Sequence, residues 1–342
     1  MKKLLNTLFV MTQGAYLAKK GETVVVKVER EERLRLPIHN LEGICCFGNV
    51  SCSPFLMGLC GERGVGLSFF SESGRFMARS IGAISGNVLL RKAQYRLSED
   101  GDNSAKLARN MIVAKIANCR TSIRRGVRDA HVLDNRTLET CSDRLTVILA
   151  ELKKTMDLAS LRGKEGEAAR AYFSAFGNLI TSQAEDFSFH GRNRRPPQDN
   201  VNALLSFVYT LLCHDVSNAL EGVGLDPQVG FLHRDRPGRA SLALDLMEEL
   251  RPLIADRLVL SLINRRQVSP SGFIVRESGG VIMDEQTRKK VLGAYQKRKQ
   301  DEFRHPFLDE KISLGLLPYC QSLLLARFLR GDLPEYPPLR WR

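Results

Sequence analysis

Aromatic residues are scarce in this sequence: they make up 7% of its 342 residues, and only one of them is tryptophan. A protein that binds single strands by stacking their bases needs several exposed rings, so the composition argues against a pure stacking protein. No apolar stretch approaches the length of a membrane span. Polar residues such as Asn6 and Thr12 interrupt the apolar run near the start, and no small-residue cleavage site follows it. We therefore expect neither a signal peptide nor membrane association.

The cysteines also lack a recognisable framework. There are eight of them, and none forms a CxxC pair. Most lie in apolar surroundings, which is typical of reduced, buried thiols in a cytoplasmic protein. The sequence therefore predicts neither a disulfide scaffold nor a zinc site built from paired cysteines.

Acidic residues are too few to balance the basic ones, with 38 Asp and Glu against 51 Lys and Arg, a formal net charge of +13. A surplus of this size favours a polyanionic partner, and nucleic acid is the commonest one. The alternative is a generally basic protein of unrelated function. Hydrophobic residues make up 43% of the chain, enough for sizeable cores, and its length favours two domains.

The first 96 residues are predicted to form a β domain. Short segments rich in β-branched and aromatic residues are separated by Gly, Asn and Ser, as is typical of strands and turns. The expected strands are Leu8–Met11, Thr23–Val28, Arg33–Ile38 and Gly66–Phe70. Further turns are expected at 40–43 and 61–64, and Gly74-Arg75 is expected to form a hairpin turn. A small antiparallel sheet or a β-sandwich fits this pattern.

The remainder is predicted to be mainly helical. A polar segment at 97–106 is expected to be a linker, and residues 107–330 are expected to form an α-helical catalytic domain, followed by a Pro-rich extended tail at 331–342. Helical periodicity is found over 104–125, 136–158, 165–180, 201–220, 241–264 and 312–330. A hairpin is expected at 273–283, followed by a basic helix capped by Asp284. The predicted fold class is α+β, with the segment at 201–220 as a central core helix.

Glu165 stands in the segment GKEGEAARAYFSAF, at the head of a predicted apolar helical stripe through Ala168, Ala169, Tyr172 and Phe176. A carboxylate that faces a core must be paired, bound to a metal, or placed at the solvated end of its helix. The alternative is that Glu165 is a favourable acid in the first helical turn.

Three other residues extend this pattern. Asp245 and Glu248 lie three apart and share a helix face, outside the apolar arc, so a solvated acidic face is the alternative for both. His233 follows the apolar segment VGFL in a loop-like stretch, where a structural histidine is the alternative. Two carboxylates and one imidazole can hold a divalent metal and leave positions open for a reacting phosphate.

Arginines cluster between these segments. Arg192, Arg194 and Arg195 precede Pro196-Pro197, which stiffens the entry into a helix. Arginines on a stiff loop could clamp phosphates, and a solvated basic loop is the alternative. We expect these three residues to bind nucleic acid. We expect the same of three further arginines, Arg234, Arg265 and Arg266.

Several segments together resemble a known family. The helical part contains GKEGEAARAYFSAF, NRRPPQDNVNALLSFVYTLL, GFLHRDRPGRASLALDLMEELRP and LPYCQSLLLARFL, and the β part contains NTLFV, LPIHNLEGI and LLRKAQY. In this order and spacing they resemble the first-numbered CRISPR-associated (Cas) protein, the integrase and endonuclease of spacer adaptation in antiviral defence. The form that accompanies type I-C systems is the most similar.

The resemblance implies a β-sandwich dimerisation domain followed by an α-helical domain. It also implies a homodimer that assembles with the small ferredoxin-like second Cas protein, and a Mg²⁺ or Mn²⁺ site. Carried over by motif, the metal ligands are Glu165, His233 and Glu248, because the last ligand of the family varies between Asp and Glu. Asp245 matches a nearby acid that is sometimes assigned to the catalytic site, and its role stays open.

The implied reaction is insertion of spacer DNA into a CRISPR repeat array, in which a 3′-hydroxyl attacks a phosphodiester with the help of the metal. Double-stranded DNA, as the incoming prespacer and as the repeat, is the expected substrate. Two alternatives stay open. One is a basic dimeric DNA-binding scaffold whose acids are structural, and the other is a general metal-dependent repair nuclease.

Overall fold

A computed structural model of the chain describes residues 6–72, 74–80, 82, 88–128, 135–154 and 156–341. The chain divides into two compact units, Met1–Ser85 and Gly86–Arg342. The second unit begins with α2 (Val88–Glu99) and α3 (Gly101–Val127), so the polar segment expected as a linker is a junction between two helices. Its acids have a local purpose, because the Asp100 carboxylate caps α3 by accepting hydrogen bonds from the Asp102 and Asn103 amides.

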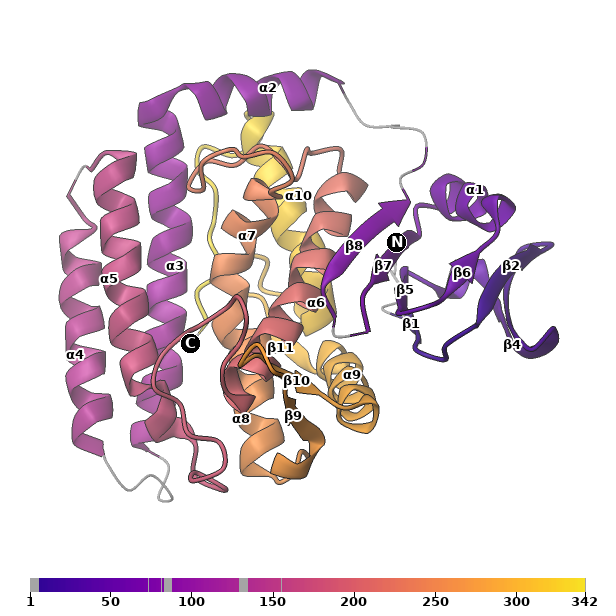
Figure 1. Cartoon of the computed structure of the whole chain (residues 1–342). Helices are drawn as coiled ribbons and strands as arrows, with labels where there is room; N and C mark the ends of the chain where they lie inside the picture. The colour runs from indigo at the N-terminus through magenta and orange to yellow at the C-terminus, as the bar shows by residue number, and fades with distance from the viewer. Residues whose placement is uncertain are drawn as a thin grey trace. The chain divides into compact units, whose positions relative to one another are not determined.

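The N-terminal unit contains two four-stranded sheets (Figure 1). The first has the order β1 (Thr7–Val10), β5 (Gly43–Phe47), β7 (Gly66–Phe70) and β8 (Phe76–Ser80). The second has the order β4 (Glu31–Pro37), β3 (Thr23–Val28), β2 (Tyr16–Lys20) and β6 (Ser51–Cys52). Both contribute to one apolar core, together with residues of α1 (Pro54–Arg63). The expected β-rich first region of an α+β protein is therefore confirmed.

The expectation of a purely antiparallel sheet is wrong. β1, β5 and β7 are parallel, and so are β2 and β6. For β5 and β7 the crossover contains α1, which was not predicted from the sequence, and β1 and β5 are connected through β2, β3 and β4. The Ser53 hydroxyl caps the first turn of α1 and Gly64, with a φ of 66°, ends the helix. The hairpin between β7 and β8 is confirmed, with Gly74 at a φ of 87°.

The C-terminal unit is mostly helical. α3 packs against α4 (Asn135–Glu151), α5 (Leu158–Phe176) and α7 (Ser241–Arg251), and Figure 1 shows α4, α5 and α3 side by side. The remaining helices are α6 (Asn200–Gly222), α8 (Arg257–Asn264), α9 (Glu285–Gln300) and α10 (Leu317–Leu329). Two small antiparallel hairpins pair β9 (Phe273–Val275) with β10 (Val281–Met283) and β11 (Glu302–Arg304) with β12 (Lys311–Ser313). Short helical turns lie at Ile38–Asn40, Gly177–Leu179, Pro252–Asp256, Pro270–Gly272 and Leu314–Leu316.

α6 is the expected core helix. By length and composition it could cross a membrane, contrary to the expectation that no stretch approaches that length, but 67% of its most apolar window is buried inside the protein. It packs against α7, α8 and α10. All eight cysteines are free, and none is fully exposed.

Several helix ends differ from the expected ones. α4 ends at Glu151, and α5 begins at Leu158, where the Asp157 carboxylate accepts a hydrogen bond from the Ser160 amide. The segment at 241–264 is α7 and α8 separated by a π-helical turn that begins at Pro252, since proline cannot continue the backbone hydrogen bonding of a helix. The hairpin at 273–283 and the cap of α9 by Asp284 are confirmed.

Candidate active site

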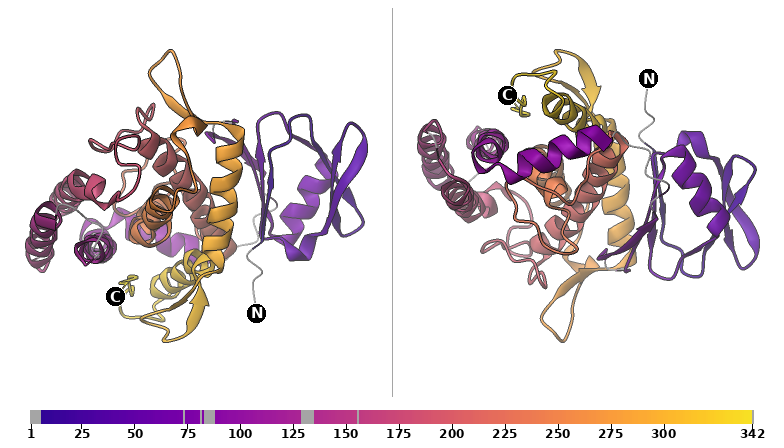
Figure 2. Two further views of the ribbon diagram at one scale, coloured as in Figure 1. Left: turned by 90° about the horizontal axis from the view of Figure 1, so that it is seen from below. Right: turned by 90° about the horizontal axis from the view of Figure 1, so that it is seen from above.

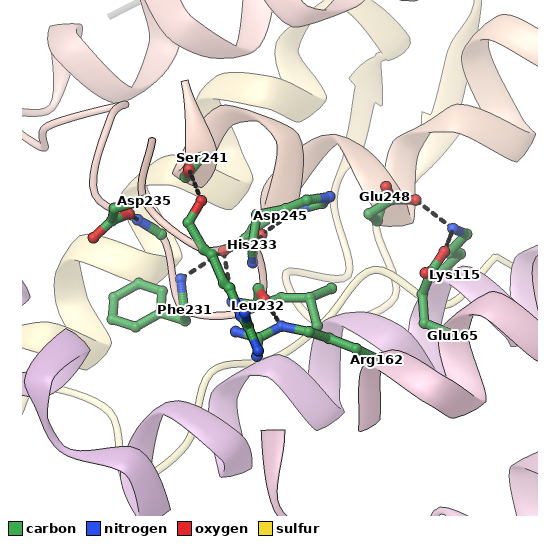
Figure 3. Close-up of polar contacts among 12 residues, drawn as sticks. Lys115, Arg162, Glu165, Phe231, Leu232, His233, Asp235, Ser241, Asp245 and Glu248 are labelled. Atoms are coloured by element: carbon green, nitrogen blue, oxygen red, sulfur yellow. Dashed lines mark hydrogen bonds and ion pairs between the residues drawn. The ribbon is translucent and has the colours of Figure 1, made fainter. Parts of the chain in front are cut away.

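A lysine lies between two of the three acidic residues that the sequence predicted. Lys115 projects from α3, is buried, and forms ion pairs with Glu165 of α5 and Glu248 of α7; its Nζ is 2.6 Å from Glu248 Oε2 (Figure 3). Burial alone would lower the pKa of Lys115, but Glu248 and Glu165 together raise it above its ordinary value. The ammonium group is therefore a fixed positive charge between two carboxylates that lie far apart in the sequence.

Glu165 lies inside α5 and not in its first turn. The helix begins at Leu158, so Glu165 is two turns from the N-terminus, and the alternative of a first-turn acid is wrong. Its side chain is 26% exposed and lines a cavity, while Ala168 and Tyr172 of the same helix are buried. Glu165 is thus a carboxylate held by Lys115 with one side open to solvent.

Glu248 is almost completely buried, with a side-chain exposure of 4%. Arg251, on the next turn of α7, places Nη1 2.8 Å from its Oε1. Burial alone would raise the pKa of Glu248, but Arg251, Lys115 and His233 hold it well below its ordinary value, at about 2. The alternative of a solvated acidic face is wrong, because α7 is enclosed by α3, α6 and α10 and its acids are covered as well as its apolar arc.

Asp245 anchors the loop that carries His233. Its Oδ2 accepts hydrogen bonds from the Phe231 and Leu232 amides, at 2.6 and 2.9 Å. Its Oδ1 accepts one from the His233 amide at 2.9 Å and lies 2.5 Å from His233 Nδ1 (Figure 3). Four donors occupy the acceptor sites of one carboxylate. The imidazole is thereby fixed, with Nε2 left for other partners.

Replacing Asp245 with asparagine should loosen this loop. The amide retains one acceptor oxygen, so at least one buried N–H group loses its partner, and we expect the free energy of unfolding to fall by about 1–3 kcal/mol. The amides of Phe231, Leu232 and His233 should then exchange hydrogen faster. Asp235→Asn is the matched control, because Asp235 is exposed and makes only a 3.3 Å hydrogen bond with the Gly230 amide. Unchanged exchange in Asp245→Asn would contradict this anchoring role.

Gly230 permits the close approach of this loop to α7. A Cβ atom at Gly230 would lie 2.8 Å from both Asp245 Oδ2 and Ser241 Cβ. Any side chain here would push the loop away from the carboxylate. The glycine thus explains why an extended segment ends directly against the helix that bears Asp245.

A cavity of about 300 Å³ opens over Glu165 and His233. Its wall is strongly basic, and its arginines are Arg162, Arg234, Arg236 and Arg239. Arg162 of α5 is held in place by a 2.6 Å hydrogen bond from Nε to the Leu232 carbonyl. Guanidinium groups around one carboxylate and an imidazole suit a phosphate that is brought to Glu165 and His233.

The structure separates the arginines that the sequence predicted as nucleic-acid ligands. Arg234 lines the cavity. Arg194, Arg195, Arg265 and Arg266 are exposed and do not line it. Arg192 is half-buried and serves the fold: it donates to Asn202 Oδ1 at 2.6 Å and to Ser206 Oγ at 3.0 Å, groups on the next helix.

Sequence reasoning missed Lys115, Arg162, Arg236, Arg239 and Arg251. A repeated arginine in RDRPGR was the one visible signal, and it marks two of the five. Nothing in the sequence near Lys115 distinguishes it from the other lysines of the chain.

Behind Glu248, a second buried acid ties three helical segments together. Asp256 accepts hydrogen bonds from the Tyr209 hydroxyl of α6 at 2.6 Å and the Tyr172 hydroxyl of α5 at 3.0 Å. The Arg251 guanidinium lies over the Tyr209 ring, 4.9 Å from its centroid. Burial raises the pKa of Asp256 to about 6, although the two hydroxyls and Arg251 act in the opposite direction.

This raised pKa predicts a pH-dependent contribution to stability. The folded state binds the Asp256 proton more tightly than the unfolded chain, whose ordinary value is 3.8. The contribution is therefore fully present below about pH 4 and is lost as the pH rises through about 6. We expect it to amount to roughly 3 kcal/mol. Urea unfolding of wild type and Asp256→Asn at several pH values measures it, since asparagine does not titrate. If the difference in free energy of unfolding between wild type and Asp256→Asn does not change with pH, the prediction is wrong.

The donor set suits a divalent cation, and the Lys115 ammonium is a stand-in for its charge. Glu165 and Glu248 already converge on one cation, and His233 lies near enough to Glu248 to lower its pKa. Carboxylate oxygens and a neutral imidazole are ligands that Mg²⁺ and Mn²⁺ accept. As the side chains lie, no group of three His, Cys, Asp or Glu within the described ranges is close enough to share an ion. The donor atoms are therefore of the type that a divalent cation binds, and Lys115 lies between the two carboxylates.

Comparison with known proteins identifies the family. The model of the CRISPR associated protein Cas1 family matches residues 8–297. The chain belongs to the Cas1 family. A Cas1 endonuclease from Chlorobaculum tepidum is 52% identical over 343 residues, and one from Rhodospirillum rubrum is 50% identical over 348 residues; both matches cover the whole of both chains. This Cas1 protein is thus a DNA-binding endonuclease and integrase of CRISPR spacer acquisition.

Solved structures agree on the Cas1 fold. A Cas1 protein from Thermotoga maritima has a TM-score of 0.83 at 23% identity, covering 97% of this chain and 98% of its own. A casposase bound to its integration product has a TM-score of 0.84 at 21% identity, covering 98% and 94%. A Cas6-RT-Cas1–Cas2 complex chain also has a TM-score of 0.84, at 20% identity, over all of this chain and 36% of its own. The expected α+β fold class is confirmed.

Proposed function

We propose that this Cas1 protein inserts spacer DNA into a repeat array by direct strand transfer at the cavity over Glu165 and His233. The 3′-hydroxyl of the incoming DNA attacks a phosphodiester of the repeat. A new P–O bond forms to the incoming strand, the existing bond to the repeat 3′-oxygen breaks, and the hydroxyl proton passes to solvent or to the departing oxygen. Water in place of the hydroxyl gives plain cleavage.

The observation that carries this proposal is that Glu165 of α5 and Glu248 of α7 both pair with Lys115, beside a cavity that Glu165 and His233 line together with four arginines. In this arrangement Arg162, Arg234, Arg236 and Arg239 bind and orient the phosphate. Asp245 holds His233 in place and is a positioning residue, because its acceptor sites are already used.

Glu165, His233 and Glu248 would hold the metal, Mg²⁺ or Mn²⁺. When bound, it supplies Lewis acidity toward a phosphoryl oxygen and makes a nearby hydroxyl more acidic. The carboxylates supply the negative charge that holds a divalent cation in a basic protein. In the absence of a metal, Lys115 neutralises that charge.

The partners follow from the resemblance and the fold. We propose that the substrates are double-stranded prespacer and repeat DNA. We also propose that the protein is a type I-C form that acts in the cytoplasm. Its proposed partner is the second Cas protein. A fold neighbour that is part of a Cas1–Cas2 complex supports the last point. The N-terminal unit would supply the homodimer contact, since the edge strand β8 exposes Phe76 and Met77.

A strand-joining assay tests the proposal. It combines a prespacer with free 3′-hydroxyls, a repeat-bearing target, Mg²⁺ or Mn²⁺ and the partner protein. Products at both repeat borders are expected. Equal DNA binding with and without Mn²⁺ and no joining would instead indicate a scaffold, and cutting of branched DNA without preference for repeat borders would indicate a repair nuclease.

A further inference from the structure

A second hollow in the helical unit is larger than the cavity over Glu165 and His233 and lies apart from it. It is a groove of about 1130 Å³ between α3, α4 and the C-terminal tail, hereafter the α3–α4 groove. Its cations are Arg109, Arg120 and Arg124 of α3, Arg128 directly after that helix, and Lys153 and Arg340. Its acids are Glu139 and Asp143 of α4. The lining thus has a surplus of positive charge.

The α3–α4 groove lies on the other side of α3 from Lys115. Arg124 is nine residues after Lys115, and nine residues are two and a half helical turns, or about 180° around the axis. Val113 and Ala117 line the same groove, whereas Lys115 is buried on the opposite face. A ligand in the groove therefore does not touch the acids of the active site.

Among the residues with described positions, the groove cations have no anionic partners. Arg120 donates to the Thr146 hydroxyl at 3.0 Å, and Arg128 donates to the Arg124 carbonyl at 3.2 Å, both neutral acceptors. Over the residues for which the structure gives positions, none of the six cations forms an ion pair, although Asp143 lines the same groove. Guanidinium groups that keep their charge exposed are free to bind an external anion.

The tail forms a wall of the groove. The C-terminal end of the ribbon lies beside α3 in both views of Figure 2. Asn118 donates to the Leu339 carbonyl at 2.9 Å and accepts from the Trp341 amide at 2.7 Å. The buried Glu249 carboxylate accepts from the Leu339 amide at 2.8 Å. The position of Arg340 is thus set by built contacts on both sides of it.

The length over which the groove cations are spread favours an extended polyanion. From Arg109 to Arg128 the helix rises about 28 Å, close to the length of eight phosphates along one strand of DNA. The single tryptophan, Trp341, is only 6% exposed, with Arg125 and Arg257 over its ring. No ring is therefore offered to unpaired bases from this residue, and contacts to a duplex backbone are favoured over stacking.

Positive charge also accumulates next to the groove. Burial and the neighbouring Arg298 and Arg125 lower the pKa of Arg257 to about 10. Guanidinium groups repel one another here, so a polyanion close by would relieve that repulsion.

We infer that the α3–α4 groove is a second DNA-binding surface, which holds a duplex by its phosphate backbone on the opposite face of α3 from the active site. The inference rests on the DNA chemistry of the proposed function but not on the metal ligands. A surface of this kind would hold a flank of the DNA while another part reacts.

The test compares two triple substitutions in the full chain. Arg120, Arg124 and Arg128→Gln removes three groove charges, and Arg96, Arg276 and Arg327→Gln removes three exposed charges elsewhere in the helical unit. Fluorescence anisotropy with a labelled 30-bp duplex over a salt series gives the affinity. We expect the groove variant to bind roughly 100-fold more weakly at about 0.15 M salt, with a salt slope shallower by about 3. The control should retain most of its affinity.

Two further measurements make the result decisive. A photoreactive benzoylphenylalanine in place of Ser142, which lines the groove, should cross-link to the duplex, and the same group in place of Arg276 should not. At saturating DNA the groove variant should join strands at the wild-type kcat with a raised KM. Equal affinity of the two triple variants, or no cross-link from position 142, overturns the inference and leaves an acidic protein segment as the occupant. If wild type joins nothing, the proposed function fails while the binding result still stands.

Discussion

Replacing Glu165 with alanine should reduce strand joining by about 10²–10³-fold, the scale on which loss of one electrostatic group in an active site acts. Glu165 lines the cavity and is more exposed than Glu248, with which it shares Lys115. Without it, a divalent cation would lose one of two charged ligands. Joining products, quantified on a denaturing gel with Mg²⁺ or Mn²⁺, measure this effect.

DNA binding by the same variant should stay within about threefold of wild type, because the cavity arginines and the α3–α4 groove are untouched. Glu167 offers a matched control on the same helix, since it pairs with Arg144 and Lys164 at the surface and does not line the cavity. Glu167→Ala should join strands normally. Retained joining in Glu165→Ala would reject the assignment of the active site.

Replacing Lys115 with methionine should strongly destabilise the metal-free protein. The change keeps the length of the side chain and removes its charge, so Glu248 and Glu165 lose their shared cation in a buried place. We expect the free energy of unfolding to fall by about 3 kcal/mol. This is at the lower end of the range for removing one partner of a buried ion pair, because Arg251 still faces Glu248. Urea unfolding of the metal-free protein measures this loss.

Mn²⁺ should restore much of that stability in Lys115→Met, because a divalent cation then neutralises the same two carboxylates. The thermal shift on adding Mn²⁺ should accordingly be larger in the variant than in wild type. Lys115→Arg serves as the control, since it retains a cation. An equal loss of stability with and without Mn²⁺ would show that Lys115 does not stand in the place of a metal.

Local patterns predicted much of the architecture. The strands β3 and β7, the hairpin at 273–283, the cap of α9 by Asp284 and the apolar core helix α6 were all readable from spacing and turn residues. These features depend on neighbours within a few residues, which is the range over which periodicity and capping act. The helix α1 was not predicted because its apolar residues are spread around the helix and form no clear stripe.

The environment of the site could not be predicted in the same way. The pattern of α7 placed Asp245 and Glu248 outside the apolar arc, which normally means solvent. In the structure α7 is enclosed by α3, α6 and α10, so that both acids are buried and each needs a partner from elsewhere in the chain. Which faces of a helix are covered is decided by its neighbours, and the sequence of one helix does not contain them.

The sequence by itself determined the order of a β-rich and a helical region, the basic charge, and, through motif resemblance, the acids and the imidazole to be considered. Only the tertiary structure brought Lys115 from α3 between Glu165 and Glu248, used up Asp245 on the His233 loop, and gathered the arginines of α3, the tail and the cavity wall. Charges separated by tens of residues act on one another only when folding brings them within a few ångströms in a medium that screens them poorly.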